Sequence, residues 1–351
     1  MVSVGILNET NVDNGHFGCI RVMDCIYDRL QERGIRVSVA VPSGLDWRSE
    51  AEYVTGLSSS NLILVNGEGT LHHGRRKGRW LLEIAEAEEL VGIPKVLVNA
   101  VWQGNPADWG KLLRQFDLVT TRDSWSANEA SESIGRDVEW LPDLSVFSPV
   151  ASSSTQARSG IIIGDSASNA ASIALAELGK SLENAGRDVV LAPVVTKDHG
   201  THRQTGWRRL RLKLRNWRLH SAQRGLSSVS FNTNVEEYLE ALAGASLNIN
   251  GRFHAICLSL VTRTPFIAFT SNSWKIEALI EDVGLDRDRL KARGEFGPKD
   301  LERRDWKFSD RELENIDEFL ARSHIGIPQL FDEVERLALE NERQVGPEKS
   351  V

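Results

Sequence analysis

The sequence predicts an α/β protein with two doubly wound, Rossmann-like domains that face a cleft. Short runs of apolar and β-branched residues alternate with amphipathic stretches, and this alternation starts afresh after a polar interruption near residue 150. The length of 351 residues also fits two domains of ordinary size. Ligands of open parallel sheets bind beyond the carboxyl ends of the strands, so ligand-binding residues are expected directly after each strand.

Strands of the first domain are expected at five short apolar runs: 4–7, 37–41, 62–65, 96–98 and 118–121. Their nearly continuous apolarity is typical of parallel strands that are covered on both faces. Amphipathic helices are expected at 21–33 and 80–90, and each is followed by a glycine, Gly34 or Gly92, as helix ends often are. A series of strands and helices in this order predicts a doubly wound sheet.

A polar run without periodicity, residues 148–156, separates the two halves and is predicted to be a linker. The predicted boundaries are 1–148 for the first domain, 149–158 for the linker, 159–325 for the second domain and 326–351 for a C-terminal helix and tail. Strands of the second domain are expected at 161–163, 189–191, 247–249 and 266–269. Its helices are expected at 170–184, 235–243, 255–262 and 274–283.

Composition narrows the classes of function. The formal net charge of −7 argues against general binding of nucleic acid. Three cysteines, Cys19, Cys25 and Cys257, are too few and too irregularly spaced for a disulfide framework or a common zinc motif. We expect buried thiols, no metal and no cofactor. The first residues carry no basic leader and no run is apolar over 18 residues, so a cytoplasmic location is expected.

Two glycine-containing segments follow predicted strands of the first domain. Their candidate ligand-binding residues are Asn14, Gly15, Gly67, Gly69 and Thr70. Glycine lets the backbone come close to a ligand and point its N–H groups at an anion. Ordinary turn chemistry explains the same residues equally well.

A third segment of the first domain begins with Arg122, directly after the strand at 118–121. A guanidinium at this edge can bind a carboxylate or a phosphate in bidentate fashion. The alternative is a structural ion pair or helix cap that involves the neighbouring Asp123.

The sharpest motif lies in the second domain, where Arg252 and His254 follow a predicted strand and begin a helix. The positive end of a helix, an arginine and a histidine together bind an anion and can also transfer protons. Lys275, after the next strand, adds a possible cation. The alternatives are a buried structural Arg–His pair and a solvated lysine.

Taken in order, these segments resemble the polysaccharide pyruvyl transferase family. The matching pieces are Asn14-Gly15, Gly67-Glu68-Gly69-Thr70-Leu71, Arg122-Asp123-Ser124-Trp125-Ser126, Leu141-Pro142-Asp143-Leu144, Gly251-Arg252-Phe253-His254-Ala255 and Lys275. The resemblance covers residues 3 to about 285. Three features depart from the family pattern: Glu68 replaces a glycine, His16 replaces an acidic residue, and the usual Tyr-Asp-Pro is missing near Lys275.

This resemblance implies a GT-B-like fold and phosphoenolpyruvate as donor, with a pyruvate ketal on a sugar of a surface polysaccharide as product. Arg252 and Arg122 would hold the phosphate and the carboxylate, with Lys275 as a possible third cation. His254 would be the general acid, because imidazole exchanges protons near cellular pH. Asp143 or Glu68 would deprotonate the acceptor. The first domain would then serve the acceptor and the second the donor.

A strongly basic segment, residues 203–224, contains no Asp or Glu. On a helix, its apolar residues share one face, and four arginines share another: Arg208, Arg211, Arg215 and Arg218. This pattern predicts a peripheral contact with an anionic membrane surface. A packed helix with a solvated basic face and a polyanion site are the alternatives.

Two other functions compete with pyruvyl transfer. A GT-B glycosyltransferase would need an acidic residue in the second domain for the ribose of a nucleotide sugar, and Glu277 and Glu281 are the suitable positions. A non-enzymatic adaptor would bind membranes or polyanions through residues 203–224, and would not need Arg252 and His254 to lie together.

Overall fold

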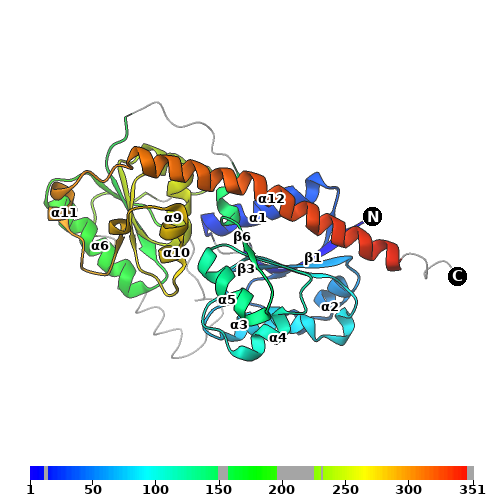
Figure 1. Cartoon of the computed structure of the whole chain (residues 1–351). Helices are drawn as coiled ribbons and strands as arrows, with labels where there is room; N and C mark the ends of the chain where they lie inside the picture. Colours follow the sequence, from blue (N-terminus) through cyan, green and yellow to red (C-terminus); the bar gives the residue numbers. More distant parts are fainter. Residues whose placement is uncertain (12–14, 149–156, 196–224, 231, 346–351) are drawn as a thin grey trace. The chain divides into compact units, whose positions relative to one another are not determined.

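The computed structural model describes residues 1–11, 15–148, 157–195, 225–230 and 232–345, drawn as ribbon in Figure 1. Contacts divide the chain into two compact units. The first unit comprises Met1–Val12, Val22–Phe147 and Leu320–Val351, and the second comprises Asp13–Arg21 and Ser148–Phe319. This grouping differs from the predicted contiguous domains in two places, because residues 13–21 cluster with the second unit and residues 320–351 with the first.

The first unit is built on a six-stranded parallel sheet in the order β2-β1-β3-β4-β5-β6. Its strands are β1 (Ser3–Glu9), β2 (Arg36–Pro42), β3 (Leu62–Glu68), β4 (Lys95–Ala100), β5 (Leu118–Thr121) and β6 (Glu139–Trp140). Its helices are α1 (Phe17–Glu32), which starts within the second unit, α2 (Ala51–Ser58), α3 (Arg76–Leu82), α4 (Ala107–Leu113) and α5 (Ser124–Ile134). The five strands that the sequence predicted are confirmed.

Two hydrophobic clusters cover the two faces of this sheet. Ile6 and Leu64 point to one face and pack with α1 and the C-terminal helix. Leu7 and Val65, their neighbours in sequence, point to the other face and pack with α2 to α5. Successive strand residues point to opposite faces, so both faces must be apolar when both are covered.

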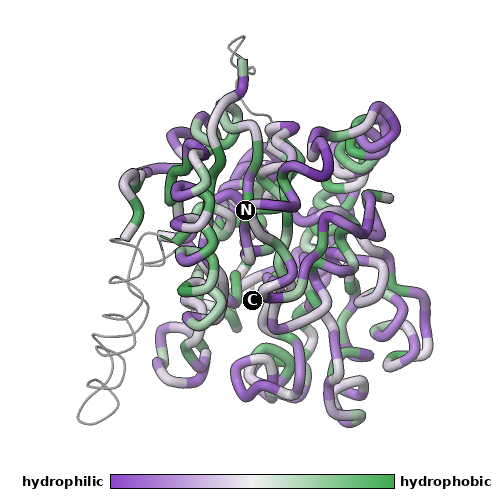
Figure 2. Tube along the Cα trace, turned by 90° about the vertical axis from the view of Figure 1, so that its left-hand side faces the viewer, coloured by the Kyte–Doolittle hydropathy of each residue, from purple (hydrophilic) through white to green (hydrophobic). Residues whose placement is uncertain are grey.

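The second unit contains a five-stranded parallel sheet in the order β11-β10-β9-β7-β8. Its strands are β7 (Ile161–Ser166), β8 (Val189–Leu191), β9 (Leu247–Gly251), β10 (Phe266–Phe269) and β11 (Leu290–Lys291). Its helices are α6 (Asn169–Asn184), α8 (Val235–Gly244), α9 (Phe253–Val261), α10 (Lys275–Val283) and α11 (Pro298–Arg303). Hydrophobic and hydrophilic residues alternate along the helices (Figure 2), as amphipathic cover requires.

Two predicted helices differ from the structure. The helix expected at 80–90 ends with α3 at Leu82 and continues as two 3₁₀ turns, where clustered glutamates disfavour a regular helix. The C-terminal helix, α12, runs from Asp310 to Val345 and not from about residue 326. Gly326 and Pro328 interrupt the sequence pattern there, yet both lie within α12.

No helix in the described part of the chain is both long and apolar enough to cross a membrane. Residues 203–224, with Arg208, Arg211, Arg215 and Arg218, lie outside the described residues. The contact with a membrane surface therefore stays a prediction.

A buried ion pair fastens the start of α12 to the second unit. Arg289 is fully buried, and its Nε and Nη2 donate to the two carboxylate oxygens of Glu312 at 2.6 and 2.8 Å. Its guanidinium also lies 4.4 Å from the ring of Phe308. Burial alone would raise the pKa of Glu312, but hydrogen bonds from Arg289 and Ser309 outweigh it and lower the pKa to about 2.

Glu312→Gln should lower the free energy of unfolding of the second unit by about 3 kcal/mol, because it leaves the Arg289 charge buried without its partner. The folded pKa of Glu312 lies below its unfolded value of 4.5, so its stabilisation is present above pH 4.5 and fades toward pH 2. Urea unfolding at several pH values measures both effects. Glu333→Gln, at an exposed ion pair on α12, is the control and should change little. Equal behaviour of the two variants would contradict this role.

Candidate functional site

The carboxyl edge of the second sheet gathers a buried network around Arg252. Arg252 is the residue before α9, and its Nε donates to Asp165 Oδ2 at 2.7 Å, at the end of β7. Asn250, at the end of β9, accepts from the Arg252 backbone N–H at 3.1 Å. The adjacent strands β7 and β9 flank the point where the strand order reverses, which is where open α/β sheets bind ligands.

Arg252 keeps part of its side chain available for a ligand. Nη2 lies 2.6 Å from the same Asp165 oxygen, whereas Nη1 donates no hydrogen bond within the described residues. The side chain is 21% exposed, against 8% for that of Asp165. Arg252 directly precedes α9, so an anion bound at the start of this helix could meet both the guanidinium and the first N–H groups of the helix.

His254 lies in the first turn of α9 and is 6% exposed. The start of α1 packs directly on it, because a Cβ added to Gly18 would lie 2.1 Å from the His254 Cβ. The His16 ring meets the His254 ring edge-on, with 5.0 Å between centroids. Phe17 fixes this approach by packing against Tyr238, 5.2 Å between centroids, in the core of the second unit.

Lys275 begins α10 and donates to Asn272 Oδ1 at 2.9 Å. The structure thus places all three predicted cationic or acid groups of the second domain, Arg252, His254 and Lys275, just after the ends of β9 and β10. The predicted proximity of Arg252 to His254 follows from their places at the start of one helix. Lys275 lies at the start of a different helix, α10, and its proximity to Arg252 and His254 stays a prediction.

The carboxyl edge of the first sheet carries a second polar network. Asn8, Glu68 and Asn99, at the ends of β1, β3 and β4, have left-handed backbones with φ of 64°, 37° and 58°. Glu68 is buried, and its Oε1 accepts from Thr10 at 2.6 Å and from Asn66 at 2.9 Å. Three non-glycine residues in this rare conformation at one edge are typical of a functional site.

Arg122 and Asp143 form an ion pair with each other. Arg122 Nη1 donates to Asp143 Oδ2 at 3.0 Å, and the two side chains are 2% and 0% exposed. Asp143 also accepts from the Ser145 backbone at 3.0 Å. The alternative that made Asp123 a helix cap is confirmed, because Asp123 caps α5 by accepting from the Ser126 N–H at 2.7 Å.

The predicted loop glycines have different surroundings. Gly67 lies inside β3, where a Cβ would approach the Ala100 Cβ to 2.5 Å, so strand packing alone requires a glycine. Gly69 lies beside Arg122, and Thr70 accepts from Asn8 Nδ2 at 3.2 Å. Gly15 is left-handed, with φ of 51°. Asn14 lies outside the described residues.

Sequence reasoning gave no role to several members of the two networks, Asn8, Thr10, Asn66, Asn99, Asp165 and Asn250, nor to Cys19, which lies near His254. A signal for most of them exists, because an asparagine stands at or next to the end of β1, β3, β4 and β9 after an apolar run. Cys19 has no such signal, and only the packing of α1 on α9 reveals it.

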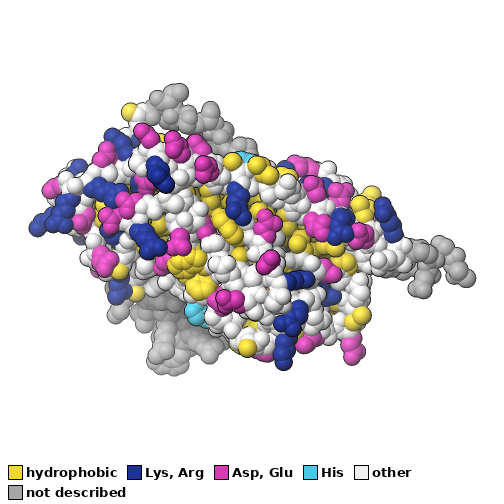
Figure 3. Space-filling model, in the orientation of Figure 1, with side chains coloured by type: hydrophobic (Ala, Val, Ile, Leu, Met, Phe, Trp, Pro, Cys, Tyr) yellow, Lys and Arg dark blue, Asp and Glu magenta, His cyan; other side chains and the backbone are white. Residues whose placement is uncertain are grey.

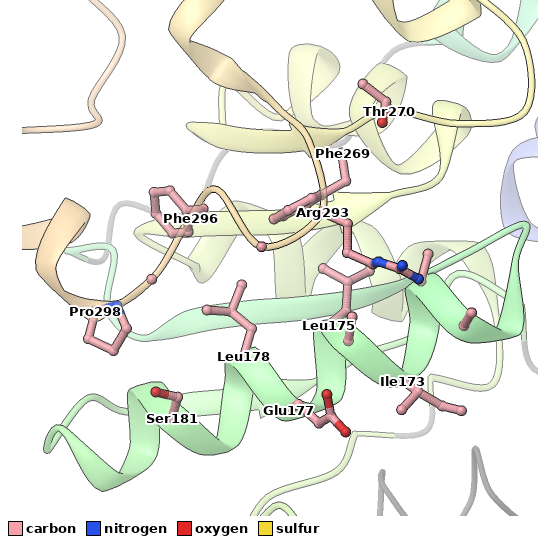
Figure 4. A pocket seen from close by; sticks show the side chains of 15 residues that line it. Ile173, Leu175, Glu177, Leu178, Ser181, Phe269, Thr270, Arg293, Phe296 and Pro298 are labelled. Carbon is pink, nitrogen blue, oxygen red and sulfur yellow. The ribbon is translucent and has the colours of Figure 1, made fainter.

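A separate cavity of about 560 Å³ lies between α6 and the segment 293–298 (Figure 4). Its walls are largely apolar and include Phe269, at the end of β10, and Phe296, and Arg293 also lines it. Glu277 is in the first turn of α10, and burial raises the pKa of its carboxyl. Glu281 is exposed and pairs with Arg287 at 2.9 Å, near the end of that helix.

The surface shows no segregation of charge on the face in Figure 3, where basic and acidic side chains are interspersed over the described residues of both units. This distribution agrees with the net charge of −7 and offers no footprint for nucleic acid on that face.

Two parallel sheets in doubly wound order, each with a polar carboxyl edge, define an α/β protein of the GT-B class. Solved glycosyltransferases share this fold. A glycosyltransferase of kitacinnamycin gives a TM-score of 0.53 at 11% identity, covering 96% of this chain and 99% of that one. SnogD from Streptomyces nogalater gives 0.52 at 11% identity, with the same coverages. An enzyme from Rickettsia africae gives 0.54 at 9% identity, covering 97% and 99%.

The family model for polysaccharide pyruvyl transferase matches residues 17–273, well over half of the chain. This chain belongs to the polysaccharide pyruvyl transferase family, so the resemblance inferred from the motifs is confirmed, as is the GT-B-like fold. The family identifies a transferase. A comparison with curated proteins found no match.

The Arg122–Asp143 pair should contribute to the stability of the folded protein only while both partners are present. Asp143→Asn should cost about 3–5 kcal/mol, because it leaves the Arg122 charge buried without compensation. The double variant Arg122→Met with Asp143→Leu should regain most of this loss, since a well-packed apolar pair replaces a buried ion pair at little cost. Urea unfolding of both variants provides the measurement. A single variant that unfolds at the wild-type urea concentration would refute the structural role of the pair.

Proposed function

We propose that this protein transfers the pyruvyl group of phosphoenolpyruvate onto two hydroxyls of a sugar in a surface polysaccharide precursor, forming a ketal and releasing phosphate. The observation that carries the proposal is the start of α9, where Arg252 and His254 lie at the switch point of the second sheet. Membership of the polysaccharide pyruvyl transferase family supports the reaction class.

The donor carries two anionic groups, and the start of α9 suits one of them. The Nη1 end of Arg252 and the first N–H groups of α9 would hold the phosphate or the carboxylate. Lys275 is the candidate cation for the other group. Asp165 fixes the guanidinium from behind, so that less conformational freedom is lost when the donor binds.

His254 would deliver the proton that starts the reaction. Protonation of the donor's methylene carbon makes a methyl group and leaves an oxocarbenium-like centre at the neighbouring carbon. One sugar hydroxyl attacks this centre and gives up its proton. The C–O bond to phosphate then breaks, and the second hydroxyl attacks, passes its proton to the departing phosphate and closes the ketal. One donor and one diol thus yield one ketal and one phosphate.

The polar edge of the first sheet is our candidate for binding the acceptor. Glu68 and Asn8 are well suited to sugar hydroxyls, since a carboxylate accepts and an amide both donates and accepts hydrogen bonds. Arg122 and Asp143 are less suited to the roles that the resemblance implies. Their charges compensate each other in a dry environment, which supports a structural function for the pair.

A second candidate function is transfer from a nucleotide sugar. The apolar cavity beside α6 favours it, because Phe269 and Phe296 could stack with a base and Arg293 could meet a phosphate. The acidic side chain that lines this cavity and could meet a ribose is that of Glu177, on α6, whereas the predicted Glu277 does not line it. Thermal unfolding with phosphoenolpyruvate and with a panel of nucleotide sugars separates the two functions. Stabilisation by phosphoenolpyruvate alone supports pyruvyl transfer, and stabilisation by a nucleotide sugar alone would reject it.

Arg252→Ala and His254→Ala should have different defects. Loss of Arg252 should weaken phosphoenolpyruvate binding about 10–100-fold, the size expected for charged hydrogen bonds. Loss of His254 should leave donor affinity nearly intact and lower turnover about 10²–10⁴-fold. Calorimetry with phosphoenolpyruvate and an assay of phosphate release measure the two effects. Arg303→Ala, at an exposed arginine of the same unit, should resemble the wild type in both. Equal loss of donor affinity at Arg252 and His254 would contradict this division of roles.

A further inference from the structure

Three potential metal ligands of the second unit lie together: His16, Cys19 and His254. One ligand atom of each, a ring nitrogen or the Sγ, lies within 4.8 Å of the other two. Cys19 and His254 are buried, and His16 is partly buried. The resemblance to the family gives a role only to His254, whereas His16 departs from the family pattern and Cys19 belongs to none of its motifs.

The fold brings these groups together through one close helix contact. His16 immediately precedes α1, so Cys19 follows it by three residues, a spacing that places both on one side of a helical turn. Gly18 lies between them, and its missing side chain lets α1 approach the His254 Cβ. An isolated bridge between His16 and Val195 and the hydrogen bond from the Phe17 N–H to the Val194 carbonyl hold this segment in place.

The donor set suits a soft or borderline divalent cation. Imidazole and thiolate together favour Zn²⁺ over Mg²⁺ or Ca²⁺, which prefer oxygen. Bonds of about 2.0–2.3 Å in a tetrahedron put ligand atoms roughly 3.4–3.6 Å apart. The ligand atoms of His16, Cys19 and His254 lie at most 4.8 Å apart, so each separation must shorten by about 1.4 Å or less for all three to bind one ion.

We propose that His16, Cys19 and His254 bind one Zn²⁺ ion, with the fourth position open to water or an anion, as in three-ligand zinc sites. The sequence alone predicts no metal, because Cys19 and Cys25 do not have the spacing of a common zinc motif and only folding brings His254 close to Cys19. Cys25 lies on the same helix but packs in the core of the first unit.

Zinc at this site has a consequence that rests on the proposed function. A His254 nitrogen that binds the ion cannot deliver a proton to the donor, so the zinc-bound protein should be inactive in pyruvyl transfer. The site would then make the enzyme sensitive to free zinc. Chelation would restore activity.

Metal binding itself can be measured without any substrate. Protein treated with a chelator and kept reduced is titrated with Co²⁺ and then with Zn²⁺. The wild type should bind one equivalent of Co²⁺ and show the ultraviolet charge-transfer band of a thiolate–cobalt bond, which Zn²⁺ then abolishes. Cys19→Ser should lose this band and bind Zn²⁺ roughly 100-fold more weakly or worse, since loss of an outer partner alone costs 10–100-fold.

Cys25→Ser is the matched control, a buried thiol on the same helix, and should bind both metals like the wild type. His16→Gln should weaken Zn²⁺ binding without touching any sulfur. The proposal is overturned if the wild type shows no thiolate band, or if Cys19→Ser binds Zn²⁺ as tightly as Cys25→Ser. If phosphoenolpyruvate proves not to be the donor, the binding results still decide the metal site, so the two ideas fail separately.

Discussion

Every strand pair in both sheets is parallel, and this constraint decides where the polar side chains lie. Parallel strands end at one edge, so the residues that follow each apolar run meet there. Asn8, Asn66 and Asn99 meet at the edge of the first sheet, and Asp165 and Asn250 at that of the second. Buried polar groups are costly without partners, and the observed networks satisfy most of them, although Asn66 Oδ1 and Asn99 Nδ2 have no partner among the described residues.

Each network contains an arginine bound to an aspartate, and burial separates their roles. Arg122 and Asp143 are almost completely enclosed and compensate each other, so removal of either charge affects mainly stability. Arg252 is bound through two of its nitrogens to one oxygen of Asp165, and its side chain is 21% exposed. It directly precedes the nine-residue helix α9. Only this second arrangement leaves positive charge for a ligand, and it is next to a histidine. The physical difference between the two pairs is the reason to assign the donor to the second unit.

The fold was largely predictable, because apolar strands and helix-ending glycines are local signals. The strands β6 and β11 span only two residues each and carry no such signal. Arg252 and His254 could be paired from sequence, since they begin one helix. Asp165 and Cys19 could not, because long-range packing brings them to α9. At Gly67 the close contact with Ala100 gives a packing reason for the glycine, and its role in ligand binding stays a prediction.

In the proposed reaction, Arg252 binds phosphoenolpyruvate and His254 delivers the proton that starts the transfer of its pyruvyl group. The most direct measurement is the reaction in D₂O with phosphoenolpyruvate and a panel of aryl and lipid-linked glycosides, followed by mass spectrometry and phosphorus NMR. Pyruvyl transfer should give inorganic phosphate in equal amount to a ketal whose methyl group carries one deuterium from the solvent. Consumption of a nucleotide sugar by the same protein, with phosphoenolpyruvate left intact, would contradict it.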